Sequence, residues 1–376
     1  MYVRAYEKSL MVYDEYVAHR HILLIVPPVL LAIGTIGNIF SFCILFKNVK
    51  KASTYSYLSA LALVDLLVLY IGLLRIWIGQ FTTDIVDTNN ILCKVGIFLG
   101  YVSSDVSVWL IVAVTIERFI VVMFPLRAPR LCNARNARIT ILVIIALFIV
   151  GNGHFLWSVE LHHYSFGKTV ISKCHARQLF TRLVEDMWPW VDAGIYSFVP
   201  FLIIMLFNSF IIKNIVSARQ KRNVLRQQSS LRSRNGVSNQ NRKQGEASKR
   251  ITFTLLVVSF TFLITTLPTN LVLIFTSFSD EADNDDDAIF AKRKLISTSA
   301  EMLMYVNHSI NFFLYCMTGR KFRDQCKMLI LHGCMSPFTS VVRGNSNRFS
   351  TSRLSMRTSK TVVVNNEHTR DFCARL

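Results

Sequence analysis

The chain has 376 residues, of which 52% are hydrophobic and only 17% are charged, and its formal net charge is +19. About a quarter of the residues in an ordinary soluble domain are charged, and disordered chains are poorer still in apolar residues. The composition therefore excludes disorder over most of the chain. It also argues against a nucleic-acid-binding protein, so the meaning of the net charge depends on where the basic residues lie.

Seven apolar runs follow one another along the chain. A helix that crosses a bilayer needs about 20 mostly apolar residues. Five of the runs contain no charged residue, and the other two contain one acid each. In chain order the runs cover residues 22–46, 52–74, 95–116, 139–159, 193–212, 251–279 and 302–319. A soluble helix rarely avoids charge over such lengths, because one of its faces meets water. We therefore predict an all-α membrane protein with a seven-transmembrane helix bundle over residues 22–318.

The basic residues lie mainly in alternate connections. Residues 47–51, 120–138 and 213–250, together with the tail from residue 319, contain 29 bases and four acids, whereas the rest of the chain contains 13 bases and 19 acids. Positively charged loops stay on the cytoplasmic side of a membrane. We therefore predict a multi-pass protein of the plasma membrane with its N-terminus outside and its C-terminus inside. No cleavable signal peptide is predicted, because no basic tip precedes the first run directly.

Four segments follow from this topology. Residues 1–21 are expected to form an extracellular N-terminus, residues 22–318 the bundle, residues 319–331 a helix lying on the membrane, and residues 332–376 a disordered cytoplasmic tail. Within the bundle, residues 219–250 are polar and are expected to form a flexible cytoplasmic loop.

The eight cysteines are unequally distributed across the predicted membrane. Cys93 opens the third run and Cys174 precedes the fifth, so both lie on the outside, where disulfides persist. The other six lie in spans or on the reducing side, which predicts a Cys93–Cys174 disulfide. Cys326 and Cys334 follow a basic amphipathic stretch near membrane lipid and are candidates for palmitoylation, with plain reduced thiols as the alternative.

Several polar residues lie inside the spans, where they are costly and therefore indicate function. Asp65 lies in the second run, and Asn38, Ser107, Asn307 and Asn311 lie in the first, third and seventh. We expect these side chains to share one polar core. A carboxylate surrounded by hydroxyl and amide oxygens suits a hard cation, so Asp65 is the candidate ligand of an allosteric sodium ion, and no other cofactor is expected. The alternative is a hydrogen-bond network that only joins helices.

A second polar group lies toward the outer ends of the spans. Arg75, Asp105, Asp192 and Glu301 belong to the second, third, fifth and seventh runs or their flanks. Short acidic side chains cannot reach far toward water, so these residues predict a polar cavity open to the outside. Tyr101 lies near Asp105 in the same run, and its ring could cover a bound cation. The alternative is that one of the acids pairs with Arg75.

The pattern as a whole resembles the rhodopsin-like (class A) G protein-coupled receptors over residues 22–331. The resemblance rests on motifs in the family's order and spacing: Gly37-Asn38, Leu61-Ala62-Leu63-Val64-Asp65, Glu117-Arg118-Phe119 in place of DRY, Pro200, Pro268, Asn311-Phe312-Phe313-Leu314-Tyr315 in place of NPxxY, and Phe322. Two departures stand out. Phe312 replaces a proline, and Thr265-Thr266-Leu267-Pro268 lacks the tryptophan of CWxP.

The resemblance implies a receptor rather than an enzyme. Such a receptor would promote nucleotide exchange on a heterotrimeric G protein, with receptor kinases and arrestin as further partners. The residues implied in coupling and activation are Glu117, Arg118, Phe119, Pro268, Asn311 and Tyr315. No acid precedes Lys249 and Arg250 at the foot of the sixth run, which leaves Glu117 as the expected resting partner of Arg118.

The resemblance also indicates a class of ligand. Gly100 stands where receptors for amines have an aspartate, and Tyr305 stands where opsins have a lysine. The stretches Ser107–Leu110, His154–Trp157 and Asn311–Cys316 are most similar to invertebrate FMRFamide-type neuropeptide receptors. An amidated RFamide-like peptide would bring an arginine to carboxylates of the cavity. The alternatives are a class A receptor for another peptide or small ligand and, more distantly, a polytopic transporter, although no matched pair of broken helices is present.

Overall fold

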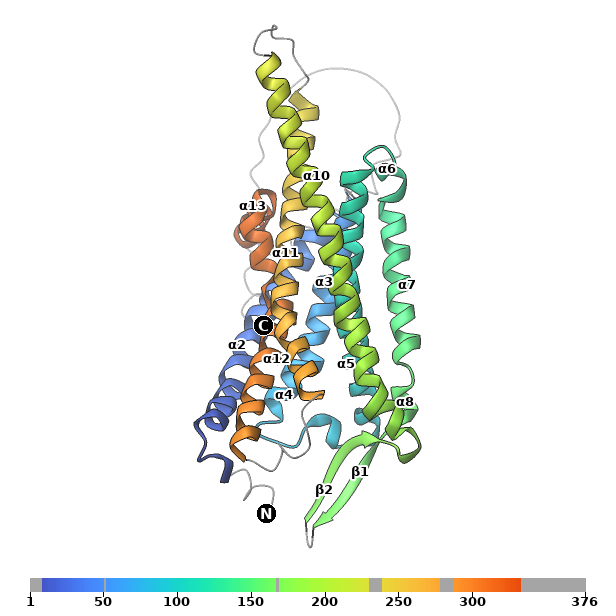
Figure 1. Cartoon of the computed structure of the whole chain (residues 1–376), viewed down its shortest axis with the longest axis vertical. Coiled ribbons are helices and arrows are strands. Elements are labelled where there is room, and N and C mark those ends of the chain that lie inside the picture. The colour runs from blue at the N-terminus through green and yellow to red at the C-terminus, as the bar shows by residue number, and fades with distance from the viewer. Residues whose placement is uncertain (1–8, 51, 167–168, 230–238, 278–286, 333–376) are drawn as a thin grey trace, which may run out of the picture. The chain divides into compact units, whose positions relative to one another are not determined.

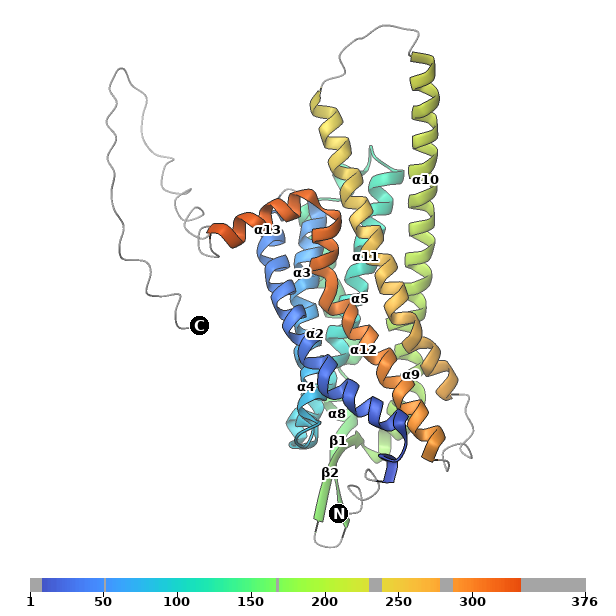
Figure 2. The ribbon, with the colours of Figure 1, turned by 90° about the vertical axis from the view of Figure 1, so that its left-hand side faces the viewer.

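The structure is a computed structural model that describes residues 9–50, 52–166, 169–229, 239–277 and 287–332 (Figure 1). The chain divides into two units, Met1–Lys327 and Met328–Leu376, and the helix bundle lies in the first. The long helices run side by side in this unit (Figures 1 and 2). The main helical elements are α2 (Asp14–Phe46), α3 (Ser53–Val68), η1 (Leu69–Leu73), α4 (Leu74–Ile78), α5 (Asn90–Met123), α7 (Ala134–Asn152), α8 (Phe155–Ser158), α10 (Val199–Ser229), α11 (Asn239–Ser277), α12 (Asp287–Thr318) and α13 (Arg320–His332).

Within the residues that the structure describes, six helical segments are long and apolar enough to cross a membrane. They are Asp14–Phe46, Ser53–Ile78, Asn90–Met123, Ala134–Ser158, Arg182–Ser217 and Thr252–Thr269. The seventh helix is α12, whose first half contains charged residues such as Lys292 and Glu301, so that its apolar part is short. The predicted seven-helix bundle of a multi-pass membrane protein is therefore present.

An antiparallel hairpin connects the fourth and fifth spans, and the sequence analysis did not predict it. Strands β1 (Val159–Phe166) and β2 (Thr169–Ala176) pair from Val159 opposite Ala176 to Phe166 opposite Thr169. We call the end of the bundle that carries these strands the hairpin end. The opposite end carries α6 (Ala128–Leu131), and we call it the α6 end (Figure 1). The all-α prediction is therefore correct for the bundle and incomplete for this connection.

The predicted loop over residues 219–250 is wrong at both of its ends. Helix α10 continues to Ser229, and α11 begins at Asn239. The intervening residues 230–238 lie outside the described residues. The composition that suggested a loop is rich in Arg, Lys and Gln, which are good helix formers, so polarity alone did not decide the backbone conformation.

Close packing of α2 on α12 depends on two glycines. A Cβ atom on Gly34 would lie 3.2 Å from the backbone Cα of Ser309, and one on Gly37 would lie 3.0 Å from the Cβ of Phe312. Small residues at such positions let two helices approach closely in a membrane, where packing replaces the hydrophobic effect as the main attraction. Gly37 thus accommodates the phenylalanine that stands in place of the NPxxY proline.

The described residues contain three π-helical segments, of which η4 (Arg182–Met187) begins the fifth span and the other two interrupt spans near the hairpin end. Segment η1 lies in the second span, and η5 (Ala193–Phe198) lies in the fifth, after η4 and α9 (Trp188–Asp192). The indole N–H of Trp109 donates to the backbone carbonyl of Ile195 within η5, at 3.0 Å. A π-segment leaves its helix locally irregular and is frequent at functional sites. All three segments contribute to the cavity described next.

Candidate functional site

The hairpin end of the bundle contains a cavity of about 720 Å³. Its lining comes mainly from η1, α4, α5, β2, η5 and α12, together with η2 (Ile85–Asp87). Single residues or pairs from α3, α8, β1, η4 (Arg182–Met187) and α9 (Trp188–Asp192) complete it, and Asp192 is the residue from α9. Four of the predicted pocket residues line it: Arg75, Tyr101, Asp192 and Glu301. Their sequence separations reach 226 residues, so only the closed bundle brings them together.

The fifth predicted pocket residue, Asp105, lies elsewhere, and this corrects the prediction. Its side chain is 3% exposed, and it does not belong to the cavity lining. The amide of Asn152 donates to Asp105 Oδ2 at 2.8 Å and thereby joins α5 to α7. Asp105 lies one helical turn deeper than Tyr101, at the level where it accepts the hydrogen bond of this amide. Asn152, a polar residue near the end of the fourth apolar run, was the signal in the sequence that would have indicated this contact.

The cavity has more acids than bases in its lining. Five carboxylates (Asp84, Asp87, Glu185, Asp192 and Glu301) face two cations, Arg75 and Lys173. Three of the acids already have partners. Arg75 Nε lies 3.6 Å from Asp84, Lys173 Nζ lies 2.7 Å from Asp87, and His175 Nδ1 lies 4.0 Å from Glu185. The ion-pair partner of Arg75 is therefore Asp84 and none of the three acids that the sequence analysis considered.

The remaining two acids of the lining have no partner within ion-pair distance among the described residues, although Arg75 and Lys294 act on Glu301 electrostatically from farther away. Among the described residues, neither Asp192 nor Glu301 takes part in a hydrogen bond or an ion pair, although both side chains are largely covered. A charged group that leaves water without a partner is costly. The geometry therefore leaves two carboxylates in one cavity available to a cationic group.

Aromatic side chains complete the lining. The ring of Tyr101 stacks on that of Phe155 with the centroids 4.5 Å apart. The hydroxyl of Tyr196 is buried and has no hydrogen-bond partner in the described part of the chain. Tyr305 packs against Gly72 in η1 so closely that a Cβ atom on Gly72 would collide with the tyrosine hydroxyl. The cavity thus combines anionic groups with ring faces and edges, which suits a ligand that is both cationic and aromatic.

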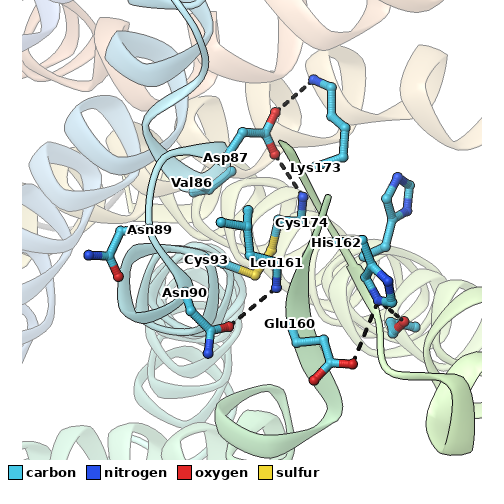
Figure 3. Close-up of a disulfide and its surroundings, with 12 residues drawn as sticks. Val86, Asp87, Asn89, Asn90, Cys93, Glu160, Leu161, His162, Lys173 and Cys174 are labelled. Carbon is cyan, nitrogen blue, oxygen red and sulfur yellow. Dashed lines mark hydrogen bonds and ion pairs between the residues drawn. A yellow bond between two sulfur atoms is a disulfide. The ribbon is translucent and has the colours of Figure 1, made fainter. Parts of the chain in front are cut away.

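The predicted disulfide joins Cys93 of α5 to Cys174 of β2, with the Cα atoms 5.6 Å apart (Figure 3). Asp87 lies beside it. Its Oδ1 accepts the backbone N–H of Cys174 at 2.8 Å, and its Oδ2 accepts Lys173 Nζ at 2.7 Å. On the other strand, the N–H of Leu161 donates to Asn90 Oδ1 at 3.2 Å. Both strands of the hairpin are therefore fixed to the start of α5 at the cavity.

The predicted polar core forms around Asp65, which has no exposed surface. Ser107 Oγ donates to Asp65 Oδ1 at 2.7 Å, and Asn311 Nδ2 donates to Asp65 Oδ2 at 2.7 Å. Asn38 Nδ2 donates to the backbone carbonyl of His308 at 2.9 Å. Asn307 is buried as well, but it makes no hydrogen bond with this group among the described residues. Four spans thus meet at the core.

His308 is a member of this core that the sequence analysis missed. Its Nδ1 lies 2.8 Å from Asp65 Oδ1, and the imidazole is completely buried. The signal was available, because an ionisable side chain inside an apolar run is a functional candidate by the rule applied to the acids. A histidine is ionisable like Asp and Glu, so its place between Asn307 and Ser309 in the seventh run marks it in the same way.

The arginine motif lies toward the α6 end. Arg118 Nη2 lies 3.5 Å from Glu117 Oε1, and both side chains are buried. The hydroxyl of Thr54 in α3 donates to the same Glu117 oxygen. The ring of Phe119 packs on Phe207 of α10, with the centroids 4.6 Å apart. Glu117 is thus the ion-pair partner of Arg118 in this structure, as the absence of an acid in the sixth span suggested.

The other predicted activation residues occupy separate positions. Pro268 lies inside α11, and Asn311 bonds to Asp65 as described. The ring of Tyr315 packs edge-on against Phe322, with the centroids 5.5 Å apart, and shares no hydrogen bond with Arg118 among the described residues. Of the two palmitoylation candidates, Cys326 is a buried free thiol, and Cys334 lies outside the described residues.

A bundle of seven apolar helices, a hairpin fixed by a disulfide beside a cavity, and a buried polar core define the seven-transmembrane receptor architecture. The family model described as "7 transmembrane receptor (rhodopsin family)" matches residues 37–315. The chain belongs to this family of class A G protein-coupled receptors, which are receptors and not enzymes.

Individual relatives are distant. The chain is 26% identical to the FMRFamide receptor of Drosophila melanogaster over 77% of its own length, but spans only 50% of that receptor. It is 21% identical to a putative G-protein coupled receptor of Caenorhabditis elegans over 90% of the chain and 77% of the relative. It is 26% identical to growth hormone secretagogue receptor type 1 of Sus scrofa over 78% of the chain and 76% of the relative.

Proposed function

We propose that the protein is a plasma-membrane receptor for a short, amidated, arginine-containing peptide of the RFamide type, and that it promotes nucleotide exchange on a heterotrimeric G protein. In this proposal the hairpin end faces the outside and the α6 end faces the cytoplasm. The distribution of basic residues supports that orientation, because residues 120–138 and 213–250 connect spans at the α6 end.

The pair of unpartnered carboxylates, Asp192 and Glu301, is the observation that carries the choice of ligand. A guanidinium donates two parallel hydrogen bonds to a carboxylate, and such charge-assisted bonds are about twice as strong as neutral ones. The stacked Tyr101 and Phe155 lie in the same lining and offer a surface for a phenylalanine ring. Printed names of relatives, an FMRFamide receptor among them, support a peptide ligand.

Transmission would follow from a change in the bundle. A ligand that binds one arrangement of the helices better than another shifts the population toward it. Pro268 removes one backbone hydrogen bond from α11 and makes this helix the natural place for a bend. An outward movement of its α6 end would open a site for the G protein, which Arg118 and Tyr315 would help to form. Receptor kinases, arrestin and inner-leaflet lipid remain proposed further partners.

The test compares matched peptides in cells that express the receptor, with calcium and cyclic AMP as readouts. One peptide ends in Arg-Phe-amide, and its analogue has citrulline, an uncharged isostere, in place of the arginine. We expect the analogue to be about 10- to 100-fold less potent, the loss that corresponds to one hydrogen-bonded charge. Equal potency of the two peptides would remove the carboxylate pairing from the proposal.

Receptor variants locate the partner of the arginine. Glu301→Gln and Asp192→Asn should lower the potency of the arginine peptide and leave the potency of the citrulline peptide almost unchanged. Glu185→Gln is the control, because Glu185 has a partner in His175. Surface expression of each variant is measured with an N-terminal epitope tag on intact cells, which also tests the orientation. A response only to a ligand without a cation would favour the class A alternatives, and uptake of a solute without a second messenger would favour a transporter.

A further inference from the structure

The Asp65 carboxylate is surrounded by hydrogen-bond donors. Its Oδ1 is contacted by Ser107 Oγ at 2.7 Å and by His308 Nδ1 at 2.8 Å, and its Oδ2 is contacted by Asn311 Nδ2 at 2.7 Å. Carboxylate oxygens accept hydrogen bonds, so we assign to His308 the tautomer that carries its hydrogen on Nδ1. Three side chains from α5 and α12 therefore already satisfy the one acid at the centre of the bundle.

A bound cation needs the opposite arrangement. Hard cations are held by several oxygen atoms whose lone pairs converge on one point. Ser107 could turn a lone pair inward, and Asn311 could present its Oδ1, which is buried without a partner. The His308 imidazole cannot do so, because its Nδ1–H points at the carboxylate and the ring has no exposed surface. The residues present therefore do not fit the sodium ion that the sequence suggested at Asp65.

The position of His308 is itself fixed from both sides. The amide of Asn38 donates to its backbone carbonyl at 2.9 Å, and Ser107 Oγ lies 3.4 Å from its Nδ1. Its Nε2 is buried and makes no hydrogen bond among the described residues. A ring that swung away to admit an ion would lose its contact with Asp65 and leave the buried Nδ1 without a partner, which is costly inside a bundle.

We propose that the His308 side chain takes the place of a monovalent cation at Asp65. The imidazole supplies from within the chain the partner that the carboxylate needs, and it links α3 to α12 directly. The consequence is a receptor whose resting bundle has the same stability in sodium as in other monovalent salts. Removal of the imidazole, with a hydroxyl left in its place, should create the cation site that the wild-type protein lacks.

The experiment measures thermal unfolding of the purified full-length receptor, followed by tryptophan fluorescence, in the chloride salts of sodium, potassium and choline at an ionic strength of about 0.15 M. No agonist is added, so the result is independent of the proposed peptide ligand. For the wild type we expect the same Tm in all three salts. A sodium-specific rise in Tm that Asp65→Asn abolishes would overturn the proposal.

The variant His308→Ser provides the second arm. We expect a lower Tm in choline than for the wild type, and a rise of about 2–4 °C in sodium when the ion is present at roughly ten times its dissociation constant. The double variant Asp65→Asn/His308→Ser should lose this rise. His154→Ser is the matched control, because it removes a histidine from another span. Nδ1 of His154 lies 3.1 Å from Ser158 Oγ, and this variant should gain no response to sodium.

A folded His308→Ser protein that ignores sodium would also overturn the proposal, because the vacated carboxylate would then not form a cation site. Folding is established separately by size-exclusion chromatography in detergent. If His308→Ser does not fold, His308→Asn serves as the second variant, since its amide oxygen offers a ligand in a smaller side chain. The wild-type comparison of salts decides the first part of the proposal in every case.

Discussion

Asp87 Oδ1 accepts the backbone N–H of Cys174 at 2.8 Å, so a carboxylate and a disulfide hold the same residue of β2 (Figure 3). The second oxygen of Asp87 bonds to Lys173 at 2.7 Å, and the Asp87 side chain is almost completely buried. Cys174, Lys173 and Asp87 all line the cavity. The position of β2 at the cavity thus depends on a covalent bond and on a charge-assisted contact that acts on the neighbouring backbone.

Replacement of Asp87 should loosen the hairpin without breaking the disulfide. In Asp87→Ala, the N–H of Cys174 and the ammonium of Lys173 both lose their acceptor, and hydrogen bonds to charged groups contribute about 1.5–3 kcal/mol each. We expect hydrogen exchange over residues 159–176 to be roughly 10- to 100-fold faster, as measured by mass spectrometry. Asp87→Asn keeps an acceptor for Cys174 and should show a smaller change.

Asp186→Asn is the control for the Asp87 variants, because Asp186 is an exposed acid close to the same connection. Its exchange over the hairpin should match the wild type. Unchanged exchange in Asp87→Ala would mean that the disulfide alone fixes β2.

The approach of α2 to α12 gives a second prediction. Gly34→Ala places a Cβ atom 2.5 Å from Leu69 Cδ1 and 2.9 Å from Ser309 Oγ, both of which are side-chain atoms that can shift. The Cβ atom also lies 3.2 Å from the backbone Cα of Ser309, which cannot move without moving α12. Overpacking of this kind costs about 1–3 kcal/mol. We expect a clear fall in Tm for Gly34→Ala in detergent or lipid nanodiscs.

The matched substitution for Gly34→Ala is Gly151→Ala in α7, because a Cβ atom there would meet nothing within 4 Å. Alanine is the better helix former by about 0.5–1 kcal/mol, so this variant should keep or slightly raise the Tm. Equal effects of the two substitutions would show that helix propensity, and not the contact with Ser309, determines the role of Gly34.

The seven helices and the disulfide could be predicted because each depends on a property that the sequence states directly. An apolar run without charge indicates a membrane span whichever face of the helix points toward the bundle. The cysteine pair followed from the side of the membrane on which each cysteine lies. Arg75, Tyr101, Asp192 and Glu301 were found by the same kind of reasoning, since depth along the span indicated one end of the bundle.

Contacts that depend on the rotation of a helix could not be predicted in this way. In α7, Leu142 and Val150 are 65% and 79% exposed, although they are as apolar as the buried Ile144. Hydropathy therefore does not reveal which face of this span meets α5, and the pairing of Asp105 with Asn152 remained hidden. The partner of Asp65 posed the same problem, because neighbouring Asn307 and His308 are equally deep and only His308 contacts the carboxylate.

The connection between the fourth and fifth spans is a different case. Two eight-residue strands separated by Gly167 and Lys168 fit a short hairpin, and a glycine in such a connection is a known signal. The alternation of apolar and polar residues in β1 is broken in the middle of the strand, because His162 and His163 are both polar and follow one another. The disulfide and Asp87 stabilise the hairpin through contacts with α5 and η2 that strand patterning does not contain.

Cys132, between α6 and α7, allows the region around Glu117 to be probed by its chemistry. Burial and, to a smaller extent, the Glu117 carboxylate raise the pKa of the Cys132 thiol from 9.0 to about 11, and Arg118 partly offsets both. The thiolate is the reactive form, and an increase of two pKa units makes it about a hundredfold rarer at neutral pH. We expect slow labelling by iodoacetamide at pH 7, with a rate that rises about tenfold per pH unit and does not level off below roughly pH 10.

The protein for this measurement keeps Cys93, Cys174 and Cys132 and has serine at the other five cysteines. Glu117→Gln removes one cause of the raised pKa and should speed the labelling at fixed pH, whereas Glu160→Gln on the distant hairpin should not. A rate that levels off near pH 9 would show that Cys132 is open to solvent and does not sense Glu117.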